Sequence, residues 1–206
     1  MPRRTIVRAG CPDGRSAAAG TAMVTLSAKR GRMDGFGRYE KPEYERRFLL
    51  REIPAGVYGP RRINDLYIRG TRLRLRKVED PAGGNEMLKL GHKRRPNPSD
   101  PTLVMHTSMY LAESEYSVLA ALDADQLSKT RYRLDLDGGE VAVDVFGADL
   151  AGLLLLEAAF CEPGPMEAFA PPPHVGAEVS GYEGFTGGNL ARLDASGYLE
   201  LRASVG

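Results

Sequence analysis

The chain contains no tryptophan, only two cysteines and only three histidines among its 206 residues. The two cysteines, Cys11 and Cys161, cannot build a disulfide framework, and no C-x-x-C pair indicates a structural zinc site. The longest apolar run, at residues 153–156, is far shorter than the roughly 20 residues that a membrane-spanning helix needs. These absences argue against a disulfide-rich secreted scaffold, a zinc ribbon and a helical membrane protein. They predict a cytoplasmic protein without a membrane partner.

The chain also lacks a strong excess of charge, because its formal net charge is only +1. Residues 1–32 hold seven of the 28 Lys and Arg residues and a single acid, so that segment carries +6 and the remainder −5. A mildly acidic body argues against a nucleic-acid partner spread over the folded domain. Because residues 1–32 show no repeating apolar pattern, we predict an N-terminal extension, disordered, over residues 1–38. A single domain is expected over 39–206.

From residue 43 onward, apolar and polar residues alternate with the period of two that is typical of strands. Eight strands are predicted, at residues 43–50, 63–69, 72–79, 86–94, 104–110, 128–135, 140–147 and 153–160. Gly-containing turns such as Arg69-Gly70-Thr71 separate them. The spacing of Leu111, Val118, Leu119 and Leu122 predicts a helix over 112–124 with an apolar stripe, and a second helical region is expected near 187–195.

The charged faces of these strands are separated by sign. Three strands present bases on one face, and two present acids. The bases are Arg72, Arg74 and Arg76, then Lys89 and Lys93, then Lys129, Arg131 and Arg133, whereas the acids are Glu140 and Asp144, then Glu157. The first strand mixes Glu43, Glu45 and Arg47.

For any one strand, a solvated outer face explains the charges well. For all of these strands together, a solvated outer face explains the charges less well. Like charges opposite one another destabilise a sheet, so solvated faces usually mix signs. A common ligand accounts for the separation, with bases for phosphate oxygens and carboxylates for an accompanying metal ion.

Six motifs occur in one order between residues 43 and 192. They are Glu43-Tyr-Glu45-Arg-Arg47, Tyr67 with Leu73-Arg74-Leu75-Arg76, Lys89-Leu-Gly-His-Lys93, Lys129-Thr130-Arg131-Tyr132, Val143-Asp144-Val145-Phe146 followed by Glu157, and a tail with Glu178-Val179-Ser180 and Asn189-Leu190-Ala191. In this order they resemble the CYTH domain of the triphosphate tunnel enzymes.

The resemblance implies an α+β, mainly β fold, namely an eight-stranded closed antiparallel barrel with a few flanking helices. It implies a metal-dependent hydrolase of triphosphate compounds that uses Mg²⁺ or Mn²⁺. The implied triphosphate-binding residues are Arg47, Arg74, Arg76, Lys93, Lys129 and Arg131. The implied metal ligands are Glu43, Glu45, Asp144 and Glu157, and the implied catalytic residues are Glu45 and Lys129.

Two positions depart from the family pattern. Arg47 replaces the lysine of the opening motif, which keeps the charge and still allows bidentate contacts with phosphate. Ala159 stands where the eighth strand of the family usually ends in a second glutamate. Because this change removes an implied metal ligand, it brings turnover into question.

Inorganic tripolyphosphate is the favoured substrate, because no aromatic or polar cluster is apparent that would hold an adenine or thiazolium ring. ATP or thiamine triphosphate stays an alternative, as does adenylate cyclase activity on the same fold. A non-catalytic binder of polyphosphate or nucleotides is the rival from another class, and an ordinary β-domain with solvated charges is the third alternative. For His92, His106 and His174, structural or surface roles are favoured over catalysis. A homodimer is plausible, since apolar outer faces need cover.

Overall fold

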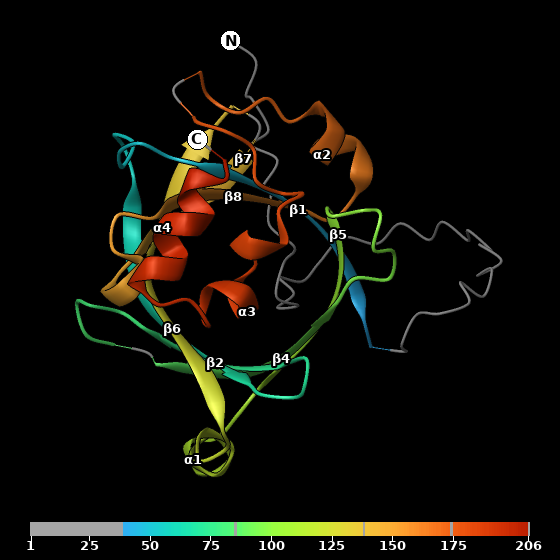
Figure 1. Ribbon diagram of the computed structural model, residues 1–206. Coiled ribbons are helices and arrows are strands. Elements are labelled where there is room, and N and C mark those ends of the chain that lie inside the picture. Colours follow the sequence, from blue (N-terminus) through green and yellow to red (C-terminus); the bar gives the residue numbers. More distant parts are fainter. Residues whose placement is uncertain (1–38, 85, 138, 174, 206) are drawn as a thin grey trace, which may run out of the picture.

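The computed structural model describes residues 39–205 except residues 85, 138 and 174. The expectation for 1–38 lies outside these residues. Eight antiparallel strands are present: β1 (Lys41–Leu49), β2 (Tyr58–Ile68), β3 (Leu73–Glu79), β4 (Met87–Arg94), β5 (Leu103–Tyr110), β6 (Ala124–Leu136), β7 (Gly139–Phe146) and β8 (Leu154–Phe160). They close into a barrel in the order β1-β5-β4-β3-β2-β6-β7-β8, which Figure 1 shows as a ring. The predicted fold class is confirmed.

The predicted alternation of faces follows from the strand pairing. Arg76 on β3 lies opposite Asp65 on β2, and Arg131 on β6 lies opposite Asp144 on β7. Between β1 and β8, Arg47 is the partner of Glu157. Since side chains directly opposite one another share a face of the sheet, these charged rows all point into the barrel.

The segment before β6 differs from its prediction. Helix α1 (Glu113–Ala120) is shorter than the expected 112–124, because the chain from Ala124 onward pairs with the end of β2. The expected apolar stripe is not buried, since Val118 is 73% exposed and Leu122 is 49% exposed. Tertiary pairing has therefore overridden the local helical pattern.

Three further helices follow the last strand. They are α2 (Pro163–Ala168), α3 (Gly187–Leu190) and α4 (Ala195–Ala203), with 3-10 turns η1 (Ala148–Leu150) and η2 (Glu183–Phe185). The region expected near 187–195 corresponds to α3 and the first residue of α4. Among the described residues, no helix has the length and hydrophobicity needed to cross a membrane.

The outer face of β1, β7 and β8 is covered by the chain that follows β8. Phe169, just after α2, packs its ring 6.1 Å from that of Phe48 and 5.5 Å from that of Phe160. Val143 and Leu156 lie in the same buried cluster. Much of the apolar outer surface that suggested a dimer is thus covered within the chain, and dimerisation stays a prediction.

The C-terminal segment crosses one mouth of the barrel. Its backbone pairs with β1, because the Val179 N–H donates to the Arg47 carbonyl at 2.8 Å and the Leu49 N–H donates to the Ala177 carbonyl at 2.9 Å. Phe185 and other apolar residues that follow then pack against the ends of the inward rows. In Figure 1, α3 and α4 lie in front of the ring of strands. This segment bounds the interior space on one side.

Candidate functional site

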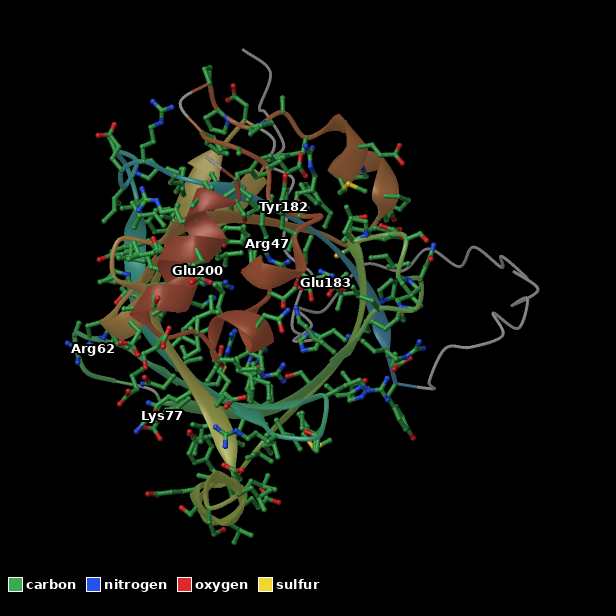
Figure 2. The ribbon with its side chains drawn as sticks, in the orientation of Figure 1. Arg47, Arg62, Lys77, Tyr182, Glu183 and Glu200 are labelled. Carbon is green, nitrogen blue, oxygen red and sulfur yellow. The ribbon has the colours of Figure 1, made fainter. Side chains whose placement is uncertain are left out.

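The interior of the barrel holds a cavity of about 440 Å³ lined by many charged side chains. Ten Lys and Arg residues and four carboxylates line it, an excess of six positive charges. The bases are Arg47, Arg72, Arg74, Arg76, Lys93, Arg94, Arg95, Lys129, Arg131 and Arg192, and the acids are Glu45, Asp144, Glu157 and Glu183. Figure 2 shows Arg47 and Glu183 inside the ring, whereas Arg62 and Lys77 lie at its periphery.

The structure brings nearly all the residues singled out in the sequence to this cavity. All six residues implied to bind triphosphate line it, and so do Glu45, Asp144 and Glu157. Glu43 lies at its edge, where one carboxylate oxygen is 3.0 Å from Lys93 Nζ and 3.5 Å from His106 Nδ1. Two bases of the predicted faces lie elsewhere: Arg133 is half exposed beside Glu140, and Lys89 Nζ lies 4.8 Å from the ring centroid of Tyr110.

Three bases and three acids from β6, β7, β8 and β1 form one continuous ion-pair network, which we call the paired wall. Its members are Arg47, Lys129, Arg131, Glu45, Asp144 and Glu157. Arg131 joins two strands, because it donates to both Asp144 oxygens at 2.6 and 2.7 Å and also contacts Glu157. Lys129 Nζ lies 2.5 Å from Asp144 Oδ2. Arg47 closes the network by contacting Glu45 and by donating to Glu157 at 3.2 Å.

The opposite side of the barrel, formed by β2 to β5, carries more base than acid. We call it the cation-rich wall, and its members are Asp65, Arg74, Arg76, Lys93 and His106. Asp65 is 1% exposed and accepts two hydrogen bonds from Arg76, both at 2.6 Å. Arg74 Nε lies 3.7 Å from the same carboxylate and has no hydrogen-bond partner. Lys93 reaches across to the paired wall and contacts Glu45.

The pKa values follow these contacts. Burial by itself raises the pKa of Glu45, but Lys93 and Arg47 outweigh it and lower that pKa to about 2. Burial likewise opposes ionisation of Asp65, and Arg76 and Arg74 lower its pKa to about 2. The pKa of Lys129 is lowered by burial and by Arg131. The two carboxylates are therefore ionised at neutral pH, as acceptors for the bases require.

Bases and acids lie mostly on different strands, as the sequence predicted. In the folded barrel, however, the basic and acidic side chains lie next to one another. Adjacent strands of opposite sign face each other across the ladder, so Glu45, Asp144 and Glu157 each lie against at least one base. The sequence analysis missed Asp65, which is the only acid on an otherwise apolar inward row of β2 between Ile63 and Tyr67. Asp65 could have been found from its spacing, because it is two residues from Tyr67 on the same strand and therefore lies on the same face.

The carboxylates of the paired wall have the oxygen donors that hard divalent ions prefer. Among the described residues, no group of three acidic, histidine or cysteine side chains stands at metal-ligand spacing. These oxygens instead accept from Arg47, Lys129 and Arg131 in this structure, so a site for Mg²⁺ or Mn²⁺ stays a prediction. A ligand that drew those bases toward itself would release oxygens for a metal ion.

Solved structures with the same fold include two of the protein NE1496. One, described as a hypothetical protein, is 24% identical, with 74% of this chain and 99% of that chain covered and a TM-score of 0.51. The other, described as the inorganic triphosphatase NE1496, is 25% identical and has a TM-score of 0.50, with 72% of this chain and 93% of that chain covered. The PH1819 protein from Pyrococcus horikoshii OT3 is 14% identical, with 61% and 82% covered and a TM-score of 0.46.

No family model and no curated protein matches the chain. The resemblance to the triphosphate tunnel family, stated above from six ordered motifs, is confirmed at the level of the fold by the likeness to NE1496.

Proposed function

We propose that this protein is a metal-dependent hydrolase of triphosphate compounds, with inorganic tripolyphosphate as its preferred substrate. The observation that carries the proposal is the cavity inside the barrel, where basic side chains exceed acidic ones by six. A triphosphate is a compact, multiply charged anion, and a charged cleft with low-dielectric walls concentrates such ions. The fold shared with a protein described as an inorganic triphosphatase supports the same reaction class.

The basic residues suit the oxygens of a phosphate chain. Guanidinium groups form paired, charge-assisted hydrogen bonds to phosphate, and Arg47, Arg74, Arg76 and Arg131 can each present such a pair. Arg74 is the most available of the four, because its Nε makes no hydrogen bond within the protein. Lys93 and Lys129 add point charges. The cavity volume of about 440 Å³ is within the usual range for a small-molecule site.

Glu45 and Lys129 are the catalytic residues in this proposal. Glu45, with Asp144 and Glu157, would hold Mg²⁺ or Mn²⁺, and Glu43 would add an oxygen from the edge. A bound divalent ion supplies charge neutralisation at the phosphoryl oxygens. Lys129 is 9% exposed and ion-paired with Asp144, so its ammonium group is held in place before the ligand enters. A base fixed in a water-poor site stabilises developing negative charge without reorganising.

A non-catalytic binder of polyphosphate is the second candidate, and Ala159 favours it. Ala159 is the cross-strand partner of Glu45, so the methyl group stands beside the proposed metal site where the family pattern has a carboxylate. Fewer oxygen donors weaken the hold on a divalent ion. Binding of phosphate by the bases does not depend on that position.

Phosphate release from tripolyphosphate, ATP and thiamine triphosphate, each with Mg²⁺, with Mn²⁺ and with chelator, tests the proposal. We expect metal-dependent release from tripolyphosphate, and loss of at least about 100-fold in Glu45→Ala. Glu113→Ala, at an exposed position of α1, is the matched control and should retain full activity. No release from any substrate, with ligand-induced thermal stabilisation intact, would establish the binding protein instead.

The substitution Ala159→Glu separates the two candidates further. If the missing carboxylate limits turnover, the substitution raises metal-dependent release and lowers the metal concentration that gives half-maximal rate. If activity is absent for other reasons as well, the substitution leaves phosphate release at the background rate.

A further inference from the structure

A small unfilled space lies in the cation-rich wall above Gly91. Gly91 is the inward-facing residue between Lys89 and Lys93 on β4, and any other amino acid there would project a Cβ atom into the cavity. That Cβ would lie 3.4 Å from His106 Nε2 and 3.6 Å from Arg74 Nη2. The imidazole and the guanidinium therefore stand on either side of a space that would hold a group the size of a methyl or a water molecule.

Two of the groups that face this space have nitrogens without hydrogen-bond partners. Among the described residues, three buried polar side-chain atoms make no hydrogen bond in the protein: His106 Nε2, Arg74 Nε and Glu43 Oε2. His106 Nε2 faces the space itself, whereas the Arg74 atom nearest to the space is Nη2. Buried polar atoms are almost always paired, so an unpaired pair beside one cavity points to a bound molecule. The other imidazole nitrogen, Nδ1, lies 3.5 Å from a Glu43 carboxylate oxygen.

Most of the polar side chains that the strands turn into the tunnel are Lys and Arg. Lys and Arg side chains only donate. The oxygens of Glu45, Asp144 and Glu157 already accept from bases. A water molecule that attacks phosphorus needs an acceptor to direct one of its protons, and it needs a donor to hold its oxygen.

We propose that the space above Gly91 binds the attacking water of the hydrolysis, with His106 as the catalytic residue that orients it. The Arg74 guanidinium donates to the water oxygen, and Nε2 of His106, in the neutral form that carries its proton on Nδ1, accepts one of its hydrogens. This inference rests on the proposed function.

The chemistry balances without an added reagent. The water oxygen forms the new bond to the terminal phosphorus, and the bond from that phosphorus to the bridging oxygen breaks. The electron pair of the broken bond stays on the departing diphosphate. One water proton remains on the new orthophosphate and the other goes to the diphosphate.

The test is steady-state hydrolysis of tripolyphosphate with Mg²⁺ by the full-length chain, comparing four variants. His106→Ala removes the acceptor, and His106→Gln places an amide oxygen near the position of Nε2. Gly91→Ala fills the space directly, and its Cβ meets neighbours at ordinary contact distances, so it should fold. His92→Ala, at the adjacent outward position of β4, is the matched control.

We expect His106→Ala and Gly91→Ala to lower kcat on the order of 10- to 100-fold with KM changed less than about 3-fold. His106→Gln should recover part of the loss, and His92→Ala should match the wild type. Thermal stabilisation by tripolyphosphate should be equal in all variants, because binding of the ligand is left intact.

Three outcomes would overturn the inference. A raised KM at unchanged kcat in His106→Ala and Gly91→Ala would show that the space binds a phosphate oxygen of the substrate instead of the water. Wild-type kinetics in both His106→Ala and Gly91→Ala would show that the attacking water does not bind above Gly91, and the proposed hydrolase function would still hold. Absence of release by the wild type itself would refute the proposed function and this inference together.

Discussion

The two walls of the barrel interior contain the same kinds of residue but differ in how completely those residues are paired. In the paired wall, each of three bases lies against one or two of three carboxylates, and both Arg131 and Arg47 contact two of them. In the cation-rich wall, Arg74 and Arg76 share the one carboxylate of Asp65, and Lys93 finds its partners on β1 instead. Buried nitrogens without hydrogen bonds are found on this second wall.

This difference indicates how one cavity can prepare for two ligands. A network that is complete without ligand holds its side chains rigidly, and it yields metal ligands only when an anion draws its bases away. A wall with excess charge stays under repulsion until an anion arrives. We therefore expect the paired wall to dominate the stability of the empty protein and the cation-rich wall to dominate the response to phosphate.

The strongest test of this comparison is the removal of the base that joins two strands. In Arg131→Ala, two buried carboxylates lose a partner, which typically costs about 3–5 kcal/mol of unfolding free energy. Chemical denaturation measures it. Arg133→Ala, two residues along the same strand and 50% exposed, is the control and should change stability by less than about 0.5 kcal/mol. Equal effects of the two substitutions would contradict the central role of the paired wall.

The second test adds the anion. Tripolyphosphate at 100 times its dissociation constant should stabilise the protein by about 2.7 kcal/mol. For a chain of this length that is a rise in melting temperature of about 5–10 °C. Differential scanning fluorimetry at several ligand concentrations measures the shift.

Arg74→Ala should remove much of that shift while leaving the unliganded protein about as stable as the wild type, because the contact between Arg74 and Asp65 is long, at 3.7 Å. Arg62→Ala, on the periphery of β2 in Figure 2, is the control. A loss of stability without ligand in Arg74→Ala would show that the cation-rich wall is not under repulsion.

Acid should weaken both walls. The pKa values of Glu45 and Asp65 fall from ordinary values of 4.5 and 3.8 to about 2 in the folded protein. A lowered pKa contributes stability above the unfolded value, and this contribution is lost as pH falls from about 4.5 to about 2. Asp65 alone should account for on the order of 2 kcal/mol.

Denaturation curves measured between pH 6 and pH 2, about one per pH unit, give the free energy of unfolding at each pH and therefore its loss in acid. In Asp65→Asn the slope in the acidic range should be visibly shallower, because that group no longer titrates. Identical slopes in the two proteins would show that Arg76 does not lower the pKa of Asp65.

The smallest effect on tripolyphosphate binding is expected at the mouth of the barrel cavity. Arg72 lines the cavity from the turn before β3 and is exposed. Screening by solvent and salt limits an exposed charge, so Arg72→Ala should weaken tripolyphosphate binding by less than about 1 kcal/mol. Isothermal titration at low and high salt should show the difference only at low salt. A larger, salt-independent loss would place Arg72 among the direct ligands.

Much of the interior could be read from the sequence, because strand periodicity is local. Arg74 and Arg76 share a parity with each other and oppose Leu73 and Leu75, so their common direction required no knowledge of the fold. The order of the motifs then indicated a closed barrel. The predicted strand at 72–79 differs from β3 by one residue.

The pairing of charges could not be read in this way. Arg47 and Glu157 are 110 residues apart, and only the register between β1 and β8 makes them partners. Asp65 stood alone in its row and had no periodic neighbour to mark it. A structural or surface role was expected for His106, and it lines the cavity because it is the cross-strand partner of the inward-facing Lys93.

By itself, then, the sequence determined which side chains of a strand share a face, since the period of two depends only on backbone geometry. The tertiary structure decided which of those charges neutralise one another and which remain available, since that depends on strand register and closure of the ring. Barrel closure placed β1 beside β8 and let Lys93 contact Glu45. It also left Arg74 and His106 facing an unfilled space.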